Sequence, residues 1–226
     1  MIRALIFDFN GVLADDDPIH MEALRQVAKE EGLAFTDAEY LEKYLPLNDR
    51  DCFTLLFREQ SIALTAAEVD DLIRRKGIYY FRAIEAKTIL FEATPAAVRT
   101  AAGRYPLAIA SGARKDEIWH ILKQAELQDC FAAIIAAEDV TFGKPHPEPF
   151  LRAHEKLRER DSTLKASDCV AIEDSLGGIE SAHQAGMRCL AVAHSYGSGR
   201  LRRANPEWVI DSLADFVPWL EKEVSK

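Results

Sequence analysis

Four short segments of the chain combine side chains that could perform chemistry, and each follows an apolar run of strand length. They are Asp8 to Gly11, Ser111-Gly112, the loop Gly143 to Pro147 around Lys144, and Glu173-Asp174. A carboxylate at the end of a buried strand is costly unless a metal or a bound group compensates it. Because the carboxyl ends of parallel strands meet at one edge of a sheet, one small anion there could touch all four segments.

Each segment also has a purely structural interpretation. Asp8 could cap a turn, and Ser111 could be the N-cap of a helix. Lys144 could be a solvated loop cation, and the acidic pair could favour a helix start through the helix dipole. Only the combination of a carboxylate, a hydroxyl, an ammonium and an acidic pair indicates a site.

The elements that must position these side chains alternate between strands and helices. Apolar runs of strand length lie at Ala4 to Phe7, Leu107 to Ala110, Ala132 to Ala137, Cys169 to Ile172, Cys189 to Ala193 and Trp208 to Ile210. Helical patterns separate them, with Thr94 expected as an N-cap before Pro95 and Gly186 as a stop signal. The alternation predicts an α/β fold with a doubly wound parallel sheet.

Residues 17–88 break the alternation, because they show helical patterns only. One apolar face ends at Gly32, and two capping boxes pair Thr36 with Glu39 and Thr65 with Glu68. We therefore expect a core domain of residues 1–16 and 89–226, with an all-helical cap domain of residues 17–88 inserted after the first strand as a lid. The basic runs at 74–76 and 200–203 are interpreted as solvated faces.

The composition restricts the class of protein. The 226 residues are 48% hydrophobic and carry a net charge of −9, which supports a full core and disfavours nucleic acid or anionic membranes as partners. The four cysteines have no CxxC spacing, so we expect buried, reduced thiols and a cytoplasmic protein. Asp8 interrupts the first apolar run too early for a signal peptide or a membrane span. A monomer is expected.

The order of the four segments resembles the haloacid dehalogenase superfamily over nearly the whole chain. The resemblance is to members with a helical cap, especially the β-phosphoglucomutase-like group of phosphatases and phosphomutases. Asp15 to His20 is similar to that group's cap entry, Gly143 to Phe150 to its lysine loop, and Val209 to Leu213 to its last strand.

The resemblance implies a role for each site residue. Asp8 would attack phosphorus to form an aspartyl-phosphate, Ser111 would bind a phosphoryl oxygen, and Lys144 would balance charge. Mg²⁺ would be held by Asp8, Asp174 and the backbone carbonyl of Asn10, which suits a cation that prefers oxygen ligands. The residues assigned to substrate binding are Gly11, Ser111, Gly112, Lys144, His20, Arg50 and Lys76, with Glu173 orienting Lys144 or a metal-bound water.

Asn10 departs from the family pattern, in which this position carries an aspartate that acts as general acid and base. A carboxamide cannot exchange a proton in this pH range, so turnover is expected to fall by about 10²- to 10⁴-fold while metal and phosphate still bind. The chain could be a slow natural variant, a natural phosphate-binding protein or an engineered trap. His20 is the nearest candidate for a substitute acid-base.

The predicted function is a Mg²⁺-dependent phosphatase that acts on a small phosphorylated metabolite. A sugar phosphomutase and a catalytically impaired phosphate-binding protein are the alternatives. The sequence contains no GxSxG elbow, P-loop or HExxH motif, so other common catalytic classes leave no trace.

Overall fold

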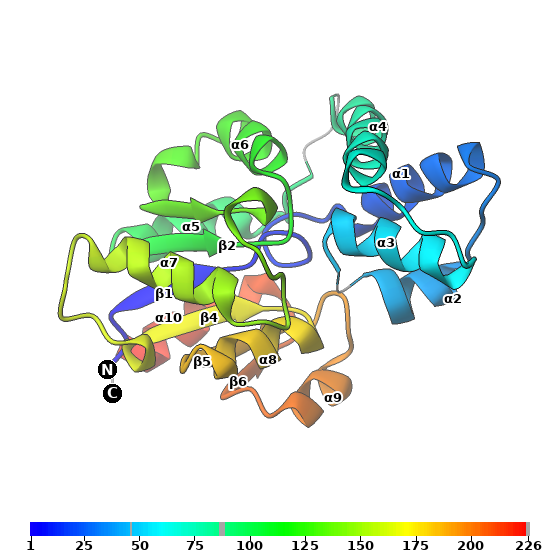
Figure 1. Cartoon of the computed structure of the whole chain (residues 1–226). Coiled ribbons are helices and arrows are strands. Elements are labelled where there is room, and N and C mark those ends of the chain that lie inside the picture. Colours follow the sequence, from blue (N-terminus) through cyan, green and yellow to red (C-terminus); the bar gives the residue numbers. More distant parts are fainter. Residues whose placement is uncertain (46, 86–88, 225–226) are drawn as a thin grey trace. The chain divides into compact units, whose positions relative to one another are not determined.

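The computed structural model describes residues 1–45, 47–85 and 89–224, which form two compact units (Figure 1). The core unit consists of Met1–Asp15 and Leu90–Lys226, and the helical unit of Asp16–Ile89. Residue 88, the expected end of the insertion, lies outside the described residues.

The core unit contains a parallel sheet in the order β3-β2-β1-β4-β5-β6, so the predicted α/β fold is confirmed. The strands are β1 Ala4–Phe7, β2 Leu107–Ala110, β3 Ala133–Ile135, β4 Cys169–Glu173, β5 Arg188–Val192 and β6 Trp208–Ile210. The strand order reverses between β1 and β4, which makes the carboxyl ends of these two strands the topological switch point where ligands gather in such sheets.

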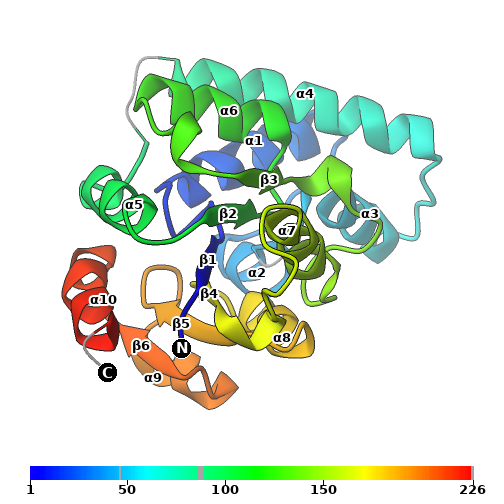
Figure 2. The same ribbon diagram turned by 90° about the vertical axis from the view of Figure 1, so that its left-hand side faces the viewer.

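Helices cover both faces of the sheet, which explains why β1, β2 and β4 are buried along their whole length. In Figure 2, α7 and α8 lie together on one face, and α5 and α10 lie on the other. The helices are α5 Thr94–Ala102, α6 Lys115–Gln124, α7 Glu148–Arg158, α8 Leu176–Gln184, α9 Ser198–Leu201 and α10 Phe216–Val224.

Four elements have boundaries that differ from the prediction, among them β4, which extends one residue further, to Glu173. β3 ends at Ile135 because a 3₁₀ turn begins at Ala137, and β5 begins and ends one residue earlier than predicted. Thr94 is the first residue of α5 rather than its N-cap, which is Ala93. The Thr94 hydroxyl instead donates to the carbonyl oxygen of Leu13 at 2.7 Å and so fixes the chain after β1.

The helical unit contains α1 Asp17–Glu30, α2 Asp37–Glu39, a π-helical turn Tyr40–Tyr44, α3 Asp49–Glu59 and α4 Ala66–Ile84. Both expected capping boxes are present, at the starts of α2 and α4. The core of the unit includes Leu24, Val27, Tyr44, Phe53, Leu56, Val69 and Leu72. The solvated-face interpretation of residues 74–76 is wrong for Lys76, whose exposed fraction is 2%.

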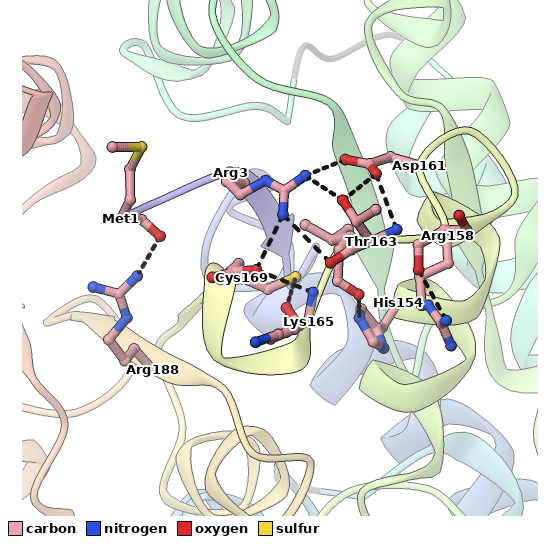
Figure 3. A network of polar contacts seen from close by, with 12 residues as sticks. Met1, Arg3, His154, Arg158, Asp161, Thr163, Lys165, Cys169 and Arg188 are labelled. Carbon is pink, nitrogen blue, oxygen red and sulfur yellow. Dashed lines mark hydrogen bonds and ion pairs between the residues drawn. The ribbon is translucent and has the colours of Figure 1, made fainter.

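An ion-pair network closes the amino-terminal end of the sheet (Figure 3). Arg3, directly before β1, contacts Asp161 at 2.5 Å and Asp168 at 3.4 Å, and it donates to the Thr163 hydroxyl at 2.9 Å. Asp168 directly precedes β4, so the network ties the starts of the two central strands together. Two of the segments predicted to form a site, Asp8 to Gly11 and Glu173-Asp174, lie at the opposite ends of the same strands.

The cysteines agree with the expectation of free thiols, but the expected burial holds for three of the four and is wrong for Cys130. All four are free, with Cys52, Cys169 and Cys189 buried and Cys130 partly exposed. None of the helices described here combines the length and the apolarity that a bilayer-spanning helix requires.

Candidate functional site

The loop after β1 places Asp8, Asn10 and Gly11 at the switch point of the sheet. The backbone N–H of Asp8 donates to the Ile172 carbonyl at 2.9 Å, which continues the pairing of β1 with β4. Gly11 then turns the chain with φ of +72°, and its N–H donates to the Ala14 carbonyl at 2.8 Å. A positive φ at this point favours glycine, so the turn fixes the direction in which the chain leaves the strand.

Lys144 lies between two carboxylates. Its Nζ atom is 2.9 Å from Oδ1 of Asp8 and 2.5 Å from Oε1 of Glu173, and it stands 5.0 Å from the centre of the Phe150 ring. Burial by itself would lower the pKa of Lys144, but Asp8 and Glu173 outweigh this effect and raise the pKa above its ordinary value. Lys144 is therefore a permanent positive charge beside Asp8.

Glu173 is fully buried and held at the start of α8. Its Oε2 atom accepts from the backbone N–H groups of Asp174 and Ser175 and from the Ser175 hydroxyl, at 3.1 to 3.3 Å. Burial raises the pKa of Glu173, and the adjacent Lys144 opposes that rise. The carboxylate thus contacts the ammonium group, and its expected role in orienting Lys144 stays a prediction.

Gly178 makes room for this arrangement. A Cβ atom at residue 178 would lie 1.9 Å from the carboxyl carbon of Glu173, closer than any real contact. The absence of a side chain on the first turn of α8 lets the carboxylate fold back over the helix start, where helix dipole and backbone N–H groups favour a negative charge.

Asp174 completes an acidic group at the edge of the sheet. One ligand atom each from Asp8, Glu173 and Asp174 lie within 4.8 Å of one another, an arrangement that could hold a cation. Since Glu173 is occupied by Lys144 and the start of α8, Asp8 and Asp174 are the better suited ligands. The Ser195 hydroxyl donates to Oδ2 of Asp174.

Ser111 follows β2 and faces Asn10. Its hydroxyl lies 3.4 Å from Oδ1 of Asn10 and accepts from the Ala113 N–H at 3.1 Å. The neighbouring Gly112 is exposed, so its backbone is open to a ligand. Asp8, Asn10, Ser111, Lys144, Glu173 and Asp174 therefore converge from four different loops of the core unit, as the parallel topology requires.

His20, Arg50 and Lys76 belong to the helical unit and form contacts within it. The Lys76 ammonium pairs with Asp49 and lies 2.7 Å from Nδ1 of His20. The His20 ring stacks on Tyr80 at 4.3 Å between centroids. Arg50 forms an exposed ion pair with Asp70 at 2.5 Å. The substrate-binding roles expected for these three residues remain predictions.

Sequence reasoning missed two polar residues at the same edge of the sheet. His194 and Ser195 follow β5, and they contact Gly11 and Asp174 respectively. The rule that singled out the other segments, a polar side chain just after an apolar run, applies to them as well. Neither residue belongs to a short motif, so nothing else in the sequence marked them.

The acidic group and the lysine beside it thus lie at the switch point of the parallel sheet, at the carboxyl ends of β1 and β4. The family model described as haloacid dehalogenase-like hydrolase matches residues 5–192, and the chain belongs to this family. The resemblance inferred from the sequence is thereby confirmed.

Individual proteins agree with this assignment. The chain is 26% identical to a phosphoglycolate phosphatase from Pectobacterium atrosepticum, over 96% of this chain and 92% of that protein. The crystal structure of β-phosphoglucomutase from Clostridium difficile has a TM-score of 0.85 at 22% identity, covering 100% of this chain and 98% of that one. An aspartate-to-asparagine mutant of CbbY from Rhodobacter sphaeroides, in complex with xylulose-1,5-bisphosphate, has a TM-score of 0.81 at 24% identity, covering 95% and 96%.

Proposed function

We propose that the chain is a Mg²⁺-dependent phosphatase that hydrolyses a small phosphorylated metabolite through an aspartyl-phosphate on Asp8. The observation that carries the proposal is the position of Asp8, held against Lys144 at 2.9 Å in a group that also contains Asp174. The phosphatase relatives support the choice of reaction.

The acidic group fits Mg²⁺, because Asp8 and Asp174 supply carboxylate oxygens and the Asn10 carbonyl is a further candidate ligand. When bound, the ion would offset the repulsion between a phosphate dianion and a carboxylate nucleophile. The Lys144 ammonium adds a fixed positive charge beside the Asp8 carboxylate, and the Ser111 hydroxyl can donate to a phosphoryl oxygen.

The reaction is a pair of displacements at phosphorus. An oxygen of the Asp8 carboxylate forms a bond to phosphorus while the bond to the leaving oxygen breaks, and that oxygen takes a proton from solvent water and leaves as the alcohol. A second water molecule then attacks phosphorus and loses a proton to solvent, the bond between phosphorus and Asp8 breaks, and inorganic phosphate leaves. Asn10 can donate a hydrogen bond but cannot deliver or remove the proton, so we expect both displacements to be slow.

A sugar phosphomutase is the second candidate, because the similar structures include a β-phosphoglucomutase. The CbbY complex adds that an asparagine variant of a similar protein can hold a bisphosphorylated sugar. We propose the cytoplasm as the compartment, since all four cysteines are free thiols, and a monomer as the oligomeric state.

The deciding experiment is a panel of phosphorylated sugars and phosphorylated small acids with Mg²⁺, followed by phosphate release and by NMR for isomers. Phosphate release by the wild type and its loss in Asp8→Ala are expected. Acid-quenched samples should carry phosphate on the peptide that contains Asp8. Formation of an isomer without release of phosphate would show that the enzyme is a mutase and not a phosphatase. If the wild type and Asn10→Asp both bound Mg²⁺ and phosphate but neither hydrolysed any ester, the protein would be a phosphate-binding protein rather than an enzyme.

A further inference from the structure

The loop after β5 contacts the site from outside its four segments. Nδ1 of His194 lies 2.8 Å from the carbonyl oxygen of Gly11, and Nε2 lies 3.2 Å from the backbone nitrogen of Leu213. A backbone N–H can only donate, so Nε2 carries no proton. A carbonyl can only accept, so Nδ1 carries the proton. The two contacts together select the Nδ1–H tautomer of the imidazole.

Packing fixes the same ring. The Phe91 ring lies 4.0 Å from the His194 ring between centroids, and the Phe91 N–H donates to the Leu13 carbonyl at 3.1 Å. His194 therefore connects the loop after β1, the loop after β5 and the turn after β6. Such a fixed side chain can hold a backbone group in place at little entropic cost.

Gly11 is the point where this connection reaches the site. A Cβ atom on Gly11 would lie 2.0 Å from Oδ2 of Asp174 and 2.8 Å from the Ser195 hydroxyl, so the glycine is pressed against the acidic group. Its carbonyl oxygen is contacted by Nδ1 of His194. A displacement of Gly11 would thus alter the spacing between Asp8, three residues earlier, and Asp174.

We propose that His194 is a positioning residue for phosphoryl transfer, which acts by holding the Gly11 carbonyl and with it the loop that carries Asp8 and Asn10. The inference rests on the proposed function, because the spacing it protects matters for attack on phosphorus. Ser195, the next residue, orients Asp174, so two consecutive residues hold both sides of the acidic group.

Two substitutions separate the two hydrogen bonds of His194. The amide nitrogen of His194→Asn can take the place of Nδ1 and keep the bond to Gly11. The longer side chain of His194→Gln reaches the place of Nε2 and can keep the bond from Leu213. Each variant loses one hydrogen bond, so a merely structural role predicts similar losses of thermal stability and of activity for both.

We expect His194→Asn to retain kcat within about threefold and His194→Gln to lose about 10- to 100-fold, with KM changed by less than about threefold. The measurements are made on the wild type and in the Asn10→Asp background, well below the melting temperature. His154→Gln is the matched control, because His154 contacts the Leu164 carbonyl at 3.1 Å near the opposite end of the sheet. Equal losses of kcat in the two His194 variants would overturn the proposal.

Two readouts need no substrate. The ¹⁵N shifts of the His194 ring should show a protonated Nδ1 and an unprotonated Nε2, and the opposite tautomer would also overturn the proposal. With Mg²⁺ alone, calorimetry should show weaker binding to His194→Gln than to His194→Asn, and equal affinities would count against positioning. If neither the wild type nor Asn10→Asp hydrolysed any ester, the proposed function would be refuted. If the enzyme were active but the two His194 variants had equal kcat, only the role of His194 would be refuted.

Discussion

Asn10 and Ser111 face each other at the carboxyl edge of β1 and β2, with the Ser111 hydroxyl 3.4 Å from Oδ1 of Asn10. The side chain at residue 10 therefore lies among the groups assigned to phosphate and its leaving oxygen. Whether residue 10 is an asparagine or an aspartate therefore decides whether its side chain can transfer a proton to or from the reacting groups.

Asn10→Asp should raise phosphatase turnover by about 10²- to 10⁴-fold with little change in KM, because a carboxyl group can protonate the leaving oxygen and then activate water. The assay must be accompanied by peptide mass analysis, since the Asn10-Gly11 pair favours deamidation and traces of aspartate would imitate slow activity. If verified Asn10 protein turned over as fast as the variant, another acid-base would have to act, with His20 examined first.

Asp174→Ala should abolish the rise of the melting temperature with Mg²⁺ while the fold remains intact. A ligand that binds only the folded state stabilises it by RT ln(1 + [L]/Kd), about 2.7 kcal/mol at a hundredfold excess over Kd. The control is Asp129→Ala, an exposed carboxylate before β3, which should keep the full shift. An undiminished shift in Asp174→Ala would remove this residue from the metal site.

Gly178→Ala should destabilise the protein by about 1–3 kcal/mol, because the new methyl group would meet the Glu173 carboxylate. It should also lower kcat, since Glu173 is expected to orient Lys144. Gly77→Ala provides the matched control within a helix, as nothing lies within 4 Å of its added Cβ, and a gain of about 0.5–1 kcal/mol is expected there. Urea unfolding measures the free energy of unfolding of both variants. Equal values for Gly178→Ala and Gly77→Ala would contradict the crowding at Gly178.

Cys130 should be the thiol that iodoacetamide modifies in the folded protein, because it is the partly exposed one of the four. Burial raises the pKa of Cys169 to about 12 and also raises the pKa of Cys52 and Cys189. At pH 8 the ionised fraction of the Cys169 side chain is then about one part in 10⁴. Mass spectrometry at pH 7 to 9 should find one label, absent in Cys130→Ser.

The same shifts fix the direction of a stability change. Burial favours the neutral thiol, so the unfolded chain, with thiols near the ordinary value of 9.0, loses protons before the folded one. The thiol contribution to stability is complete below pH 9 and is lost as the pH rises toward 12. A melting temperature that rose over this range, in the wild type relative to Cys169→Ala, would contradict the burial effect.

The sequence predicted the sheet and the convergence of Asp8, Ser111, Lys144 and Asp174, because continuous apolar runs fix parallel strands and parallel strands end at one edge. It could not show that Glu173 folds back onto Lys144, since this depends on the space that Gly178 leaves. The contact of His194 with Gly11 joins residues 183 positions apart and has no periodic signal.

The predicted boundary of a helix was wrong where two local sequence patterns fitted equally well. A Thr-Pro pair suits an N-cap followed by proline as well as the first two residues of a helix, and the bond from Thr94 to the Leu13 carbonyl decides between them. The burial of Lys76 was hidden because a charge run in a helix does not show which of its members turns inward.

The position of β1 in the sheet has a consequence for the time course of synthesis. Leu5 pairs with Leu107 and Ala4 with Cys169, so the strand made first waits for neighbours that leave the ribosome about 5 to 20 s and about 10 to 30 s later at ordinary elongation rates. The helical unit, continuous from Asp16 to Ile89, is complete before either neighbour exists. During translation the helical unit can therefore fold first, while the central strand that leads to Asp8 stays an unpaired apolar segment until β2 emerges and gains its second neighbour only when β4 follows.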